Sequence, residues 1–146
     1  MTLQIHHPVL DGRKALVVGI ANKHSIAWGC AKAFRELGAD VAVTYLNEKA
    51  LPHVQPLAAE LGSALFLPLD VSVPGQLESV FEAIEREWGR LDIVVHSIAW
   101  APKDDLQGGL LNCSAEGFAR AMDVSCHSFI RMARLAAPLM ADGGTM

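Results

Sequence analysis

A glycine turn between a short apolar run and a helical pattern most constrains how this chain can fold. Residues 15–18 form the apolar run, Gly19 begins the turn, and the helical pattern opens near Ser25. Glycine permits backbone conformations that a side chain would forbid, and the start of a helix offers unpaired N–H groups and a positive dipole end to an anion. The stretch over residues 19–29 therefore predicts a strand-to-helix turn that cradles the phosphates of a nucleotide.

Four segments are predicted to be strands, because each is a short, mostly apolar run bounded by turn residues. They are residues 15–18, 40–45, 64–69 and 91–97. Helical patterns alternate with them along the chain. This alternation predicts an α/β fold of the Rossmann type, a doubly wound parallel sheet with right-handed crossovers, in which residues 1–146 form a single dinucleotide-binding domain.

The helices between these strands have recognisable ends. The first is expected to begin near Ser25 and to end at Gly38 as its C-cap. Its covered face is predicted to carry Ile26, Cys30, Ala31, Phe34 and Leu37. Pro56 lies inside the second helical pattern, over residues 47–61, and is expected to break that helix or to delay its start.

The last helical patterns lie on either side of the fourth predicted strand. A helix over residues 77–88 is expected to end at Gly89. After the strand, a polar loop that contains Gly108 and Gly109 is expected to lead to Ser114, which can cap a long helix running to about residue 140.

Ligands of open parallel sheets bind outside the carboxyl ends of the strands, near the point where strand order reverses. Four separate positions of this chain follow the predicted strands: the turn at Gly19, residues 45–49, the pair at 70–71, and residues 97–101. The fold therefore predicts that these positions meet in one crevice.

Charge and hydropathy exclude several classes of partner. The formal net charge is -4 and no cluster of lysine and arginine occurs, so a nucleic-acid partner is excluded. No apolar run approaches the roughly 18 residues that a membrane span requires, and residues 1–8 lack the pattern of a signal peptide. We expect a soluble protein with no membrane partner.

The cysteines and the two adjacent histidines of the sequence do not predict a metal site. The 3 cysteines, Cys30, Cys113 and Cys126, contain no C-x-x-C pair, so neither a disulfide framework nor a zinc site is expected, and a cytoplasmic location fits best. His6 and His7 are adjacent, and adjacent side chains on an extended chain point in different directions. They are expected to be solvated or packed and not to bind a metal.

Three motifs together give a more specific signal than any one of them. They are G-x5-S-I-A-x-G at residues 19–29, H-S-I-A at 96–99, and the run over 108–140 that includes S-A-E-G-F at 114–118. From about residue 10 to residue 146, the chain resembles the bacterial enoyl-acyl-carrier-protein reductases of type II fatty-acid synthesis, a divergent branch of the short-chain dehydrogenase/reductase superfamily. An ordinary short-chain dehydrogenase would carry N-N-A-G where H-S-I-A stands.

The resemblance implies a nicotinamide dinucleotide cofactor. Gly19, with Ser25 and Ile26 at the helix start, would meet its phosphates and ribose. The end of the second strand, where Leu46 stands, would distinguish NADH from NADPH, since arginine usually holds the 2'-phosphate. Residues 45–49 contain no arginine, which favours NADH, although Lys49 leaves NADPH open.

The positions after the third and fourth strands would hold the rest of the cofactor. By the same resemblance, Asp70 and Val71 would flank the adenine, because a carboxylate can accept from the exocyclic amine and a branched side chain can pack on the ring. The ribose and nicotinamide side would be lined by Ser97, Ile98 and Ala99. Ala101 matches a family position at the acyl-substrate pocket.

Each of these positions also has a structural interpretation. Ser25 could be an N-cap, Asp70 could form the turn before Pro74, and His96 could be a hydrogen-bonded histidine at a strand end. The occurrence of all three motifs at matching positions favours the cofactor site.

The reaction that the resemblance implies is hydride transfer from NADH to a trans-2-enoyl thioester on acyl carrier protein, followed by protonation. The family carries its catalytic residues after strand five, as Y-x6-Y-x6-K, and the chain ends at residue 146, before or at that strand. Tyr45 is the only tyrosine, and its Y-x-x-x-K spacing to Lys49 lies at the adenosine end, away from the chemistry. We therefore assign no catalytic residue and expect the chain alone to be inactive. Asp104 and Asp105 are expected to belong to a solvated loop.

Two alternatives to this function remain at this stage. One is a non-catalytic domain or fragment that binds adenine nucleotides, and the other is a different short-chain dehydrogenase relative. The resemblance implies a homo-oligomeric parent enzyme, in which strand five covers strand four. Residues 93–95 are expected to form an uncovered apolar edge in this chain, which should then form oligomers or aggregates.

Overall fold

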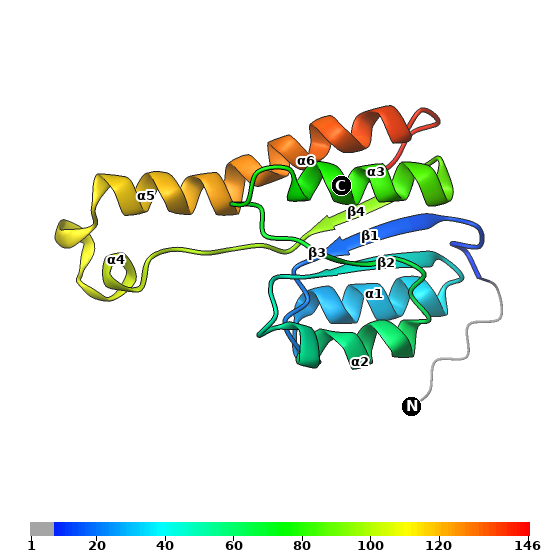
Figure 1. The fold of residues 1–146 in the computed structure, drawn as a ribbon, viewed down its shortest axis with the longest axis horizontal. Helices are drawn as coiled ribbons and strands as arrows, with labels where there is room; N and C mark the ends of the chain where they lie inside the picture. Colours follow the sequence, from blue (N-terminus) through cyan, green and yellow to red (C-terminus); the bar gives the residue numbers. More distant parts are fainter. Residues whose placement is uncertain (1–7) are drawn as a thin grey trace.

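The structure, a computed structural model that describes residues 8–146, contains a parallel sheet between two layers of helices (Figure 1). The 4 strands are arranged in the order β3-β2-β1-β4. Their bounds are β1 Lys14–Val18, β2 Asp40–Tyr45, β3 Phe66–Pro68 and β4 Ile93–His96. The predicted Rossmann-type architecture is confirmed, although β3 and β4 are shorter than their apolar runs.

Two helices cover each face of the sheet (Figure 1). One face is covered by α1 (Ile26–Glu36) and α2 (Leu51–Leu61), and the other by α3 (Gln76–Trp88) and α6 (Ser128–Ala136). Each strand is followed by a crossover to the next, and such crossovers place all carboxyl ends at one edge of the sheet. Figure 1 shows an arm leaving from that edge.

The arm contains α4 (Lys103–Gln107), a 3₁₀ turn η1 (Leu110–Asn112) and α5 (Ala115–Met122). The prediction of a polar loop here is therefore wrong in part, because two short helical segments, α4 and η1, lie within it. Their five and three residues fall below the length at which an apolar period is recognisable.

The predicted long helix from Ser114 is present but not uniform. The Ser114 hydroxyl accepts a hydrogen bond from the Gly117 amide at 2.9 Å, as an N-cap does. After α5 the helix continues through a π turn, η2 (Asp123–His127), into α6, and ends in a 3₁₀ turn, η3 (Ala137–Leu139). The π turn and the change to 3₁₀ geometry carry no sequence pattern and were not predicted.

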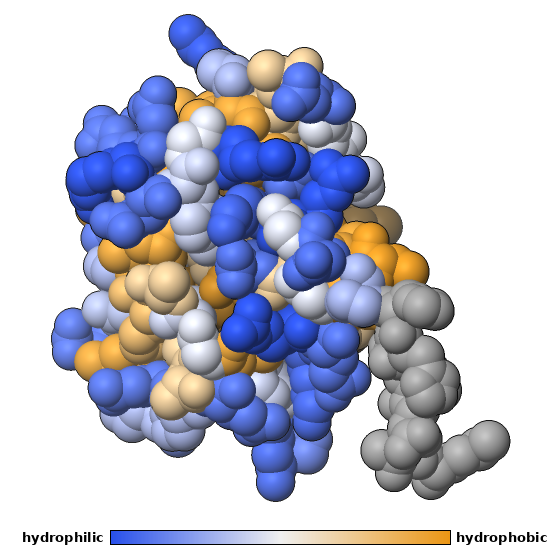
Figure 2. Space-filling model, turned by 90° about the vertical axis from the view of Figure 1, so that its right-hand side faces the viewer, coloured by the Kyte–Doolittle hydropathy of each residue, from blue (hydrophilic) through white to orange (hydrophobic). Residues whose placement is uncertain are grey.

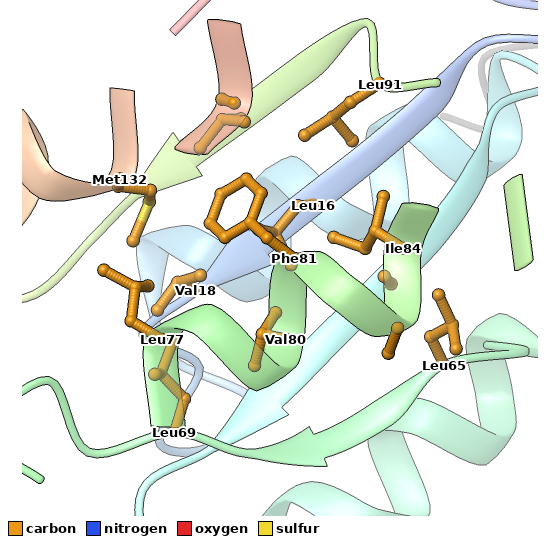
Figure 3. Packing of buried hydrophobic residues seen from close by; sticks show 14 of the residues in the cluster. Leu16, Val18, Leu65, Leu69, Leu77, Val80, Phe81, Ile84, Leu91 and Met132 are labelled. Atoms are coloured by element: carbon orange, nitrogen blue, oxygen red, sulfur yellow. The ribbon is translucent and has the colours of Figure 1, made fainter. Parts of the chain in front are cut away.

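The larger core lies between the sheet and the α3–α6 layer. Figure 3 shows side chains of α3 pointing toward β1, with Met132 of α6 beside them. Leu16, Ile84 and Met132 are 0% exposed. Burying side chains of this size contributes roughly 1.5–3 kcal/mol each, so this layer anchors α6 and, through it, η2.

The second core lies under α1 and α2, and it corrects the predicted face of α1. The buried residues of α1 are Ala27, Trp28 and Ala31, whereas Ile26 is 82% exposed and Cys30 only half-buried. Ala31 is buried and Phe34 packs against this core, as predicted, whereas Ala27 and Trp28 were not predicted. The small Ala27 and Ala31 let α1 pack close to β1 and β2. The C-cap is Leu37, and Gly38, at φ +101°, is the residue after it.

Helix α2 is not broken, so the expected break is wrong, whereas the alternative of a late start is confirmed. It runs without interruption through Pro56 and begins at Leu51, after a turn in which the Asn47 side chain accepts from the amides of Lys49 and Ala50. Pro56 is exposed, so its ring removes one hydrogen bond without disturbing the buried face.

The outer edge of β4 is covered in part. The amide of Val94 donates to the Thr145 carbonyl and the amide of Thr145 donates to the Asp92 carbonyl, both at 2.9 Å. Thr145 thus lies parallel to Ile93. The expectation that residues 93–95 form an uncovered edge is wrong for this amino-terminal part of β4.

The end of the molecule opposite the arm is predominantly hydrophilic, as Figure 2 shows, with hydrophobic residues scattered between the polar ones. Among residues 8–146, no helix is both long enough and apolar enough to cross a membrane.

Candidate functional site

A cleft of about 370 Å³ lies at the carboxyl ends of the strands, where residues following all 4 strands meet. The predicted positions that line it are Gly19, Leu46, Asp70, Val71, Ser97, Ile98 and Ala99. Between β1 and β4 the strand order reverses, and such switch points are where open parallel sheets bind ligands. The predicted convergence of the four strand ends is confirmed.

Gly19 brings two strand ends together. Its φ is +103°, and a Cβ atom there would overlap the carbonyl oxygen of Ser97 and lie 2.6 Å from the carbonyl carbon. The Ser97 amide donates to the Val18 carbonyl at 3.0 Å, so the end of β4 lies directly against the turn. Glycine is required here for close approach of two backbones as well as for the conformation of the turn.

Ser25 and Ile26 do not line the cleft. The Ser25 hydroxyl accepts hydrogen bonds from the amides of Ala21 and Asn22, at 3.0 and 3.1 Å, and so closes the turn onto the start of α1. Ser25 is the N-cap residue by position, but its side chain makes no capping hydrogen bond to α1. Its contact with the cofactor, and that of Ile26, stay predictions.

Asp70 forms the predicted turn and also lines the cleft, while its contact with adenine stays a prediction. One carboxylate oxygen accepts from the Ser72 amide at 2.8 Å, which makes the local turn, while the side chain still lines the cleft. Within the described part of the chain, the other oxygen accepts no hydrogen bond and can receive one from a ligand. Val71 is 4% exposed and gives the cleft an apolar wall beside that carboxylate.

The segment after β4 lines the opposite wall. Ser97, Ile98 and Ala99 face the cleft together with Trp100, whereas Ala101 is outside its lining. The acyl-pocket role of Ala101 is therefore untested by this geometry.

His96 is hydrogen-bonded inside the protein, as its structural interpretation predicts. Its Nε2 lies 2.6 Å from the hydroxyl oxygen of Ser128, and its ring meets Phe129 edge to face. Burial lowers the pKa of His96 below its usual value. His96 is not among the residues that line the cleft.

The long helix contributes two lining residues that the sequence did not predict, Arg120 and Val124, and Trp100 lines the cleft from the predicted segment 97–101. The guanidinium of Arg120 lies 4.7 Å from the centre of the Trp100 ring, a cation–π distance. Among the cleft-lining residues, Arg120 is the basic one and Asp70 the acidic one. Arg120 and Val124 come from the long helix, and the strand-end rule does not select helix residues.

Two residue pairs that resemble catalytic pairs in spacing, Tyr45 with Lys49 and Asp104 with Asp105, have structural contacts instead. Tyr45 packs against Phe66, with 4.8 Å between ring centres, and is not among the lining residues. Asp105 is not free in solvent, since its carboxylate accepts from the Ser114 amide at 2.6 Å and so ties α4 to the start of α5. Gly117 leaves the space that this carboxylate occupies.

No metal-binding group of three or more His, Cys, Asp or Glu occurs within residues 8–146. His6 and His7 lie outside the described residues. Cys30, Cys113 and Cys126 are free cysteines.

Comparison with protein families and sequences gives consistent matches. A family model described as enoyl-(acyl carrier protein) reductase matches residues 19–146. An NADH-dependent enoyl-[acyl-carrier-protein] reductase of Rhizobium meliloti is 44% identical over 138 residues, which are 94% of this chain and 52% of that protein. The corresponding Aquifex aeolicus protein is 44% identical over 132 residues, covering 90% of this chain and 49% of its own length.

Solved structures agree with these matches. An enoyl-acyl-carrier-protein reductase of Anaplasma phagocytophilum in complex with NAD superposes with a TM-score of 0.90 at 40% identity, over 99% of this chain and 56% of that one. A Bacillus cereus reductase with NADP+ gives a TM-score of 0.88 at 38% identity, over 94% and 55%. The chain thus spans about half the length of the relatives it matches.

Proposed function

Because this chain belongs to the enoyl-(acyl carrier protein) reductase family, we propose that it is the NADH-binding part of an enzyme that reduces trans-2-enoyl thioesters carried on acyl carrier protein. The observation that carries the proposal is the single cleft to which all 4 strand ends contribute. A cytoplasmic location belongs to the same proposal and agrees with the three free cysteines.

The lining of the cleft fits a dinucleotide. A carboxylate oxygen of Asp70 is available to the adenine amine, and the buried side chain of Val71 supplies a surface for the ring. At the phosphates, the turn at Gly19 and the first amides of α1 supply donors, with Ser25 holding the turn closed. Ser97, Ile98 and Ala99 would line the ribose and nicotinamide side.

The preference for NADH over NADPH rests on the end of β2. Leu46 is 53% exposed at the rim of the cleft, and residues 45–49 contain no arginine that could pair with a 2'-phosphate. Lys49 is the basic residue nearest in sequence, so NADPH should bind more weakly without being excluded.

When bound, the reduced nicotinamide supplies the hydride. The residues of this chain bind and orient that donor, with Ala101 toward the acyl chain. Tyr45, the only tyrosine in the sequence, packs on Phe66 outside the cleft lining and so is not placed to donate a proton there. We therefore propose that the 146 residues alone bind cofactor without turnover.

Titration of the purified chain tests this function. We expect NADH to bind more tightly than AMP, because the cleft reaches past the adenosine end to Ile98 and Ala99. With NADH and a crotonyl thioester, absorbance should show no turnover of family magnitude. Equal, weak binding of AMP and NADH would support the adenine-nucleotide domain instead, and binding of neither would refute both proposals.

A matched pair of variants identifies the adenine contact. Asp70→Asn should weaken NADH and AMP alike by about tenfold, since a charge-assisted hydrogen bond contributes about 1.5 kcal/mol. Glu48→Gln removes an exposed carboxylate outside the cleft lining and should leave both affinities unchanged.

We further propose that the arm and the long helix form a contact with a second copy of the chain. Large apolar side chains there are unusually exposed, with Leu110 at 89% and Leu111 at 98%. The others are Leu106, Phe118, Met122, Phe129 and Ile130. Exposed apolar residues concentrated in this way mark interaction surfaces.

Sizing chromatography at micromolar concentration tests that contact. The chain should elute as oligomers, and Phe118→Glu should shift it toward the monomer, because a carboxylate cannot be buried in an apolar contact. Val9→Glu, at an apolar residue that is 72% exposed but lies far from the arm in sequence, is the control and should not change the elution. A sharp monomer peak of the unmodified chain would contradict the proposal.

A further inference from the structure

We propose that the π turn η2 and the residue after it form a clamp that positions the cleft-lining segment 97–99, with Ser125 and His96 as positioning residues. The clamp holds the segment at both ends: His96 is bonded to Ser128, and Trp100 is bonded to Ser125. None of the three residues between these anchors bonds to η2 itself within the described structure. Only the identity of the ligand rests on the proposed function.

The first anchor satisfies both backbone groups of one residue. The Ser125 hydroxyl oxygen accepts from the Trp100 amide at 2.9 Å, and the hydroxyl donates to the Trp100 carbonyl at 3.1 Å. The two residues are 25 apart in the chain. A hydroxyl that is donor and acceptor to the same residue fixes the position and the orientation of the backbone at that residue.

The second anchor is a chain of two hydrogen bonds. The Ser128 hydroxyl has one hydrogen and donates it to the Val124 carbonyl at 2.7 Å, so toward His96 the same oxygen must accept. Neutral His96 therefore carries its proton on Nε2. Ser128 is 0% exposed, which keeps water from replacing either bond.

The π turn couples both anchors to the cleft. It shifts the helix from i→i+4 to i→i+5 hydrogen bonds, and such turns recur at functional sites. The Val124 carbonyl is the group that Ser128 bonds, and Val124 lines the cleft together with Ser97, Ile98 and Ala99. The same turn thus contributes a lining residue and holds the segment that lines the cleft beside it.

Holding the segment before a ligand arrives removes an ordering cost from binding. Ser97 also donates to the Val18 carbonyl at 3.0 Å, so its amide reports whether the segment stays against β1. The nicotinamide side of the ligand would meet this segment, whereas the adenine side meets Asp70 and Val71. Loss of the clamp should therefore affect NADH more than AMP.

Ser125→Ala tests the clamp in the 146-residue chain. Ser125 is partly buried, so the variant creates no large cavity. Hydrogen exchange should accelerate about tenfold at the Ser97 amide, which is not itself bonded to Ser125, as well as at Trp100. NADH affinity should fall about fivefold to tenfold while AMP affinity stays within twofold.

Two further variants complete the experiment. Ser125→Thr keeps the hydroxyl and should restore slow exchange and NADH affinity. Cys126→Ala changes the exposed neighbour in the same turn and should match the unmodified chain. Unchanged exchange at Ser97 in Ser125→Ala, or accelerated exchange with unchanged NADH affinity, would overturn the proposal. If the unmodified chain binds neither NADH nor AMP, the proposed function fails, and the exchange at Ser97 still decides whether the clamp exists.

Discussion

Gly19→Ala is expected to destabilise the folded chain by about 3 kcal/mol and to abolish NADH binding. Two costs add at this position. The backbone has φ +103°, which an L side chain rarely adopts, and the new Cβ would overlap the Ser97 carbonyl oxygen. Neither backbone can yield cheaply, because Ser97 is hydrogen-bonded to Val18 and residues 15–18 of β1 are buried between the neighbouring strands. Relief requires the end of β4 to move away from the cleft.

Alanine substitutions at two other glycines separate the conformational cost from the cost of the steric overlap. Gly12 has φ +72°, and no atom lies within 4 Å of the point that a Cβ would occupy, so Gly12→Ala should show the conformational cost alone, about 1 kcal/mol. Gly29 lies in α1 with open space around it, and Gly29→Ala should stabilise the chain by up to about 1 kcal/mol. Urea unfolding gives the three free energies, and NADH titration the binding. If Gly19→Ala lowers the free energy of unfolding no more than Gly12→Ala does, the close approach to Ser97 does not contribute to stability.

The turn at Gly19 shows how far the sequence predicts this fold. Apolar runs, turn residues and strand-helix alternation were sufficient for the sheet, its parallel direction and the convergence of the four strand ends. The sequence indicated a glycine for phosphate approach, but the neighbour that makes it indispensable is Ser97, just after β4 and almost eighty residues away in the chain. Local patterns report conformation, and they do not report which distant backbone lies alongside.

Packing choices were less predictable than topology. Ile26 was expected in the core because of its hydrophobicity, yet α1 buries Ala27 beside the predicted Ala31, because two layers that approach closely need small residues. Pro56 was expected to break α2 or to delay its start; the helix starts late, at Leu51, but it runs through Pro56, whose exposed position makes one missing hydrogen bond tolerable. In both cases the deciding factor is which side of the helix meets the sheet.

The clamp at η2 was not predictable at all. Ser125 and Ser128 look like ordinary polar residues on a helix, and only the tertiary structure puts them beside Trp100 and His96. Arg120 was missed for the same reason, since it reaches the cleft from a helix that follows the strand ends. Side chains that complete a site from a neighbouring element carry no signal in their own segment.

Asp92→Asn is expected to cost about 2–3 kcal/mol, because the carboxylate is 6% exposed and holds three donors together. Its oxygens accept from Arg13 at 2.8 Å, from Arg90 at 2.5 Å and from the Lys14 amide at 2.9 Å. An asparagine removes the charge and turns one acceptor into a donor that faces other donors. Asp40→Asn is the matched control: Asp40 pairs with Lys14 at the surface, and such exposed pairs contribute less than about 1 kcal/mol.

The cost of Asp92→Asn should depend on pH in a defined direction. Burial by itself would raise the pKa of Asp92, but the hydrogen bonds from Arg90, the Lys14 amide and Arg13 outweigh it and lower the pKa to about 2. A carboxylate whose pKa is lower in the folded state stabilises the fold above the pKa of the unfolded chain, and this stabilisation is lost as the pH falls through the folded value. The difference between the unmodified chain and Asp92→Asn should therefore be constant near neutral pH and shrink from about pH 4 to pH 2.

Urea unfolding of both chains from pH 7 to pH 2 measures that difference, and a value independent of pH would contradict the assignment. Binding distinguishes this variant from Gly19→Ala. Asp92 lies at the amino end of β4 and Ser97 follows its carboxyl end, so folded Asp92→Asn should bind NADH with unchanged affinity. Stability would then depend on one end of β4 and binding on the other, with Gly19→Ala impairing both because it separates the two backbones at the cleft itself.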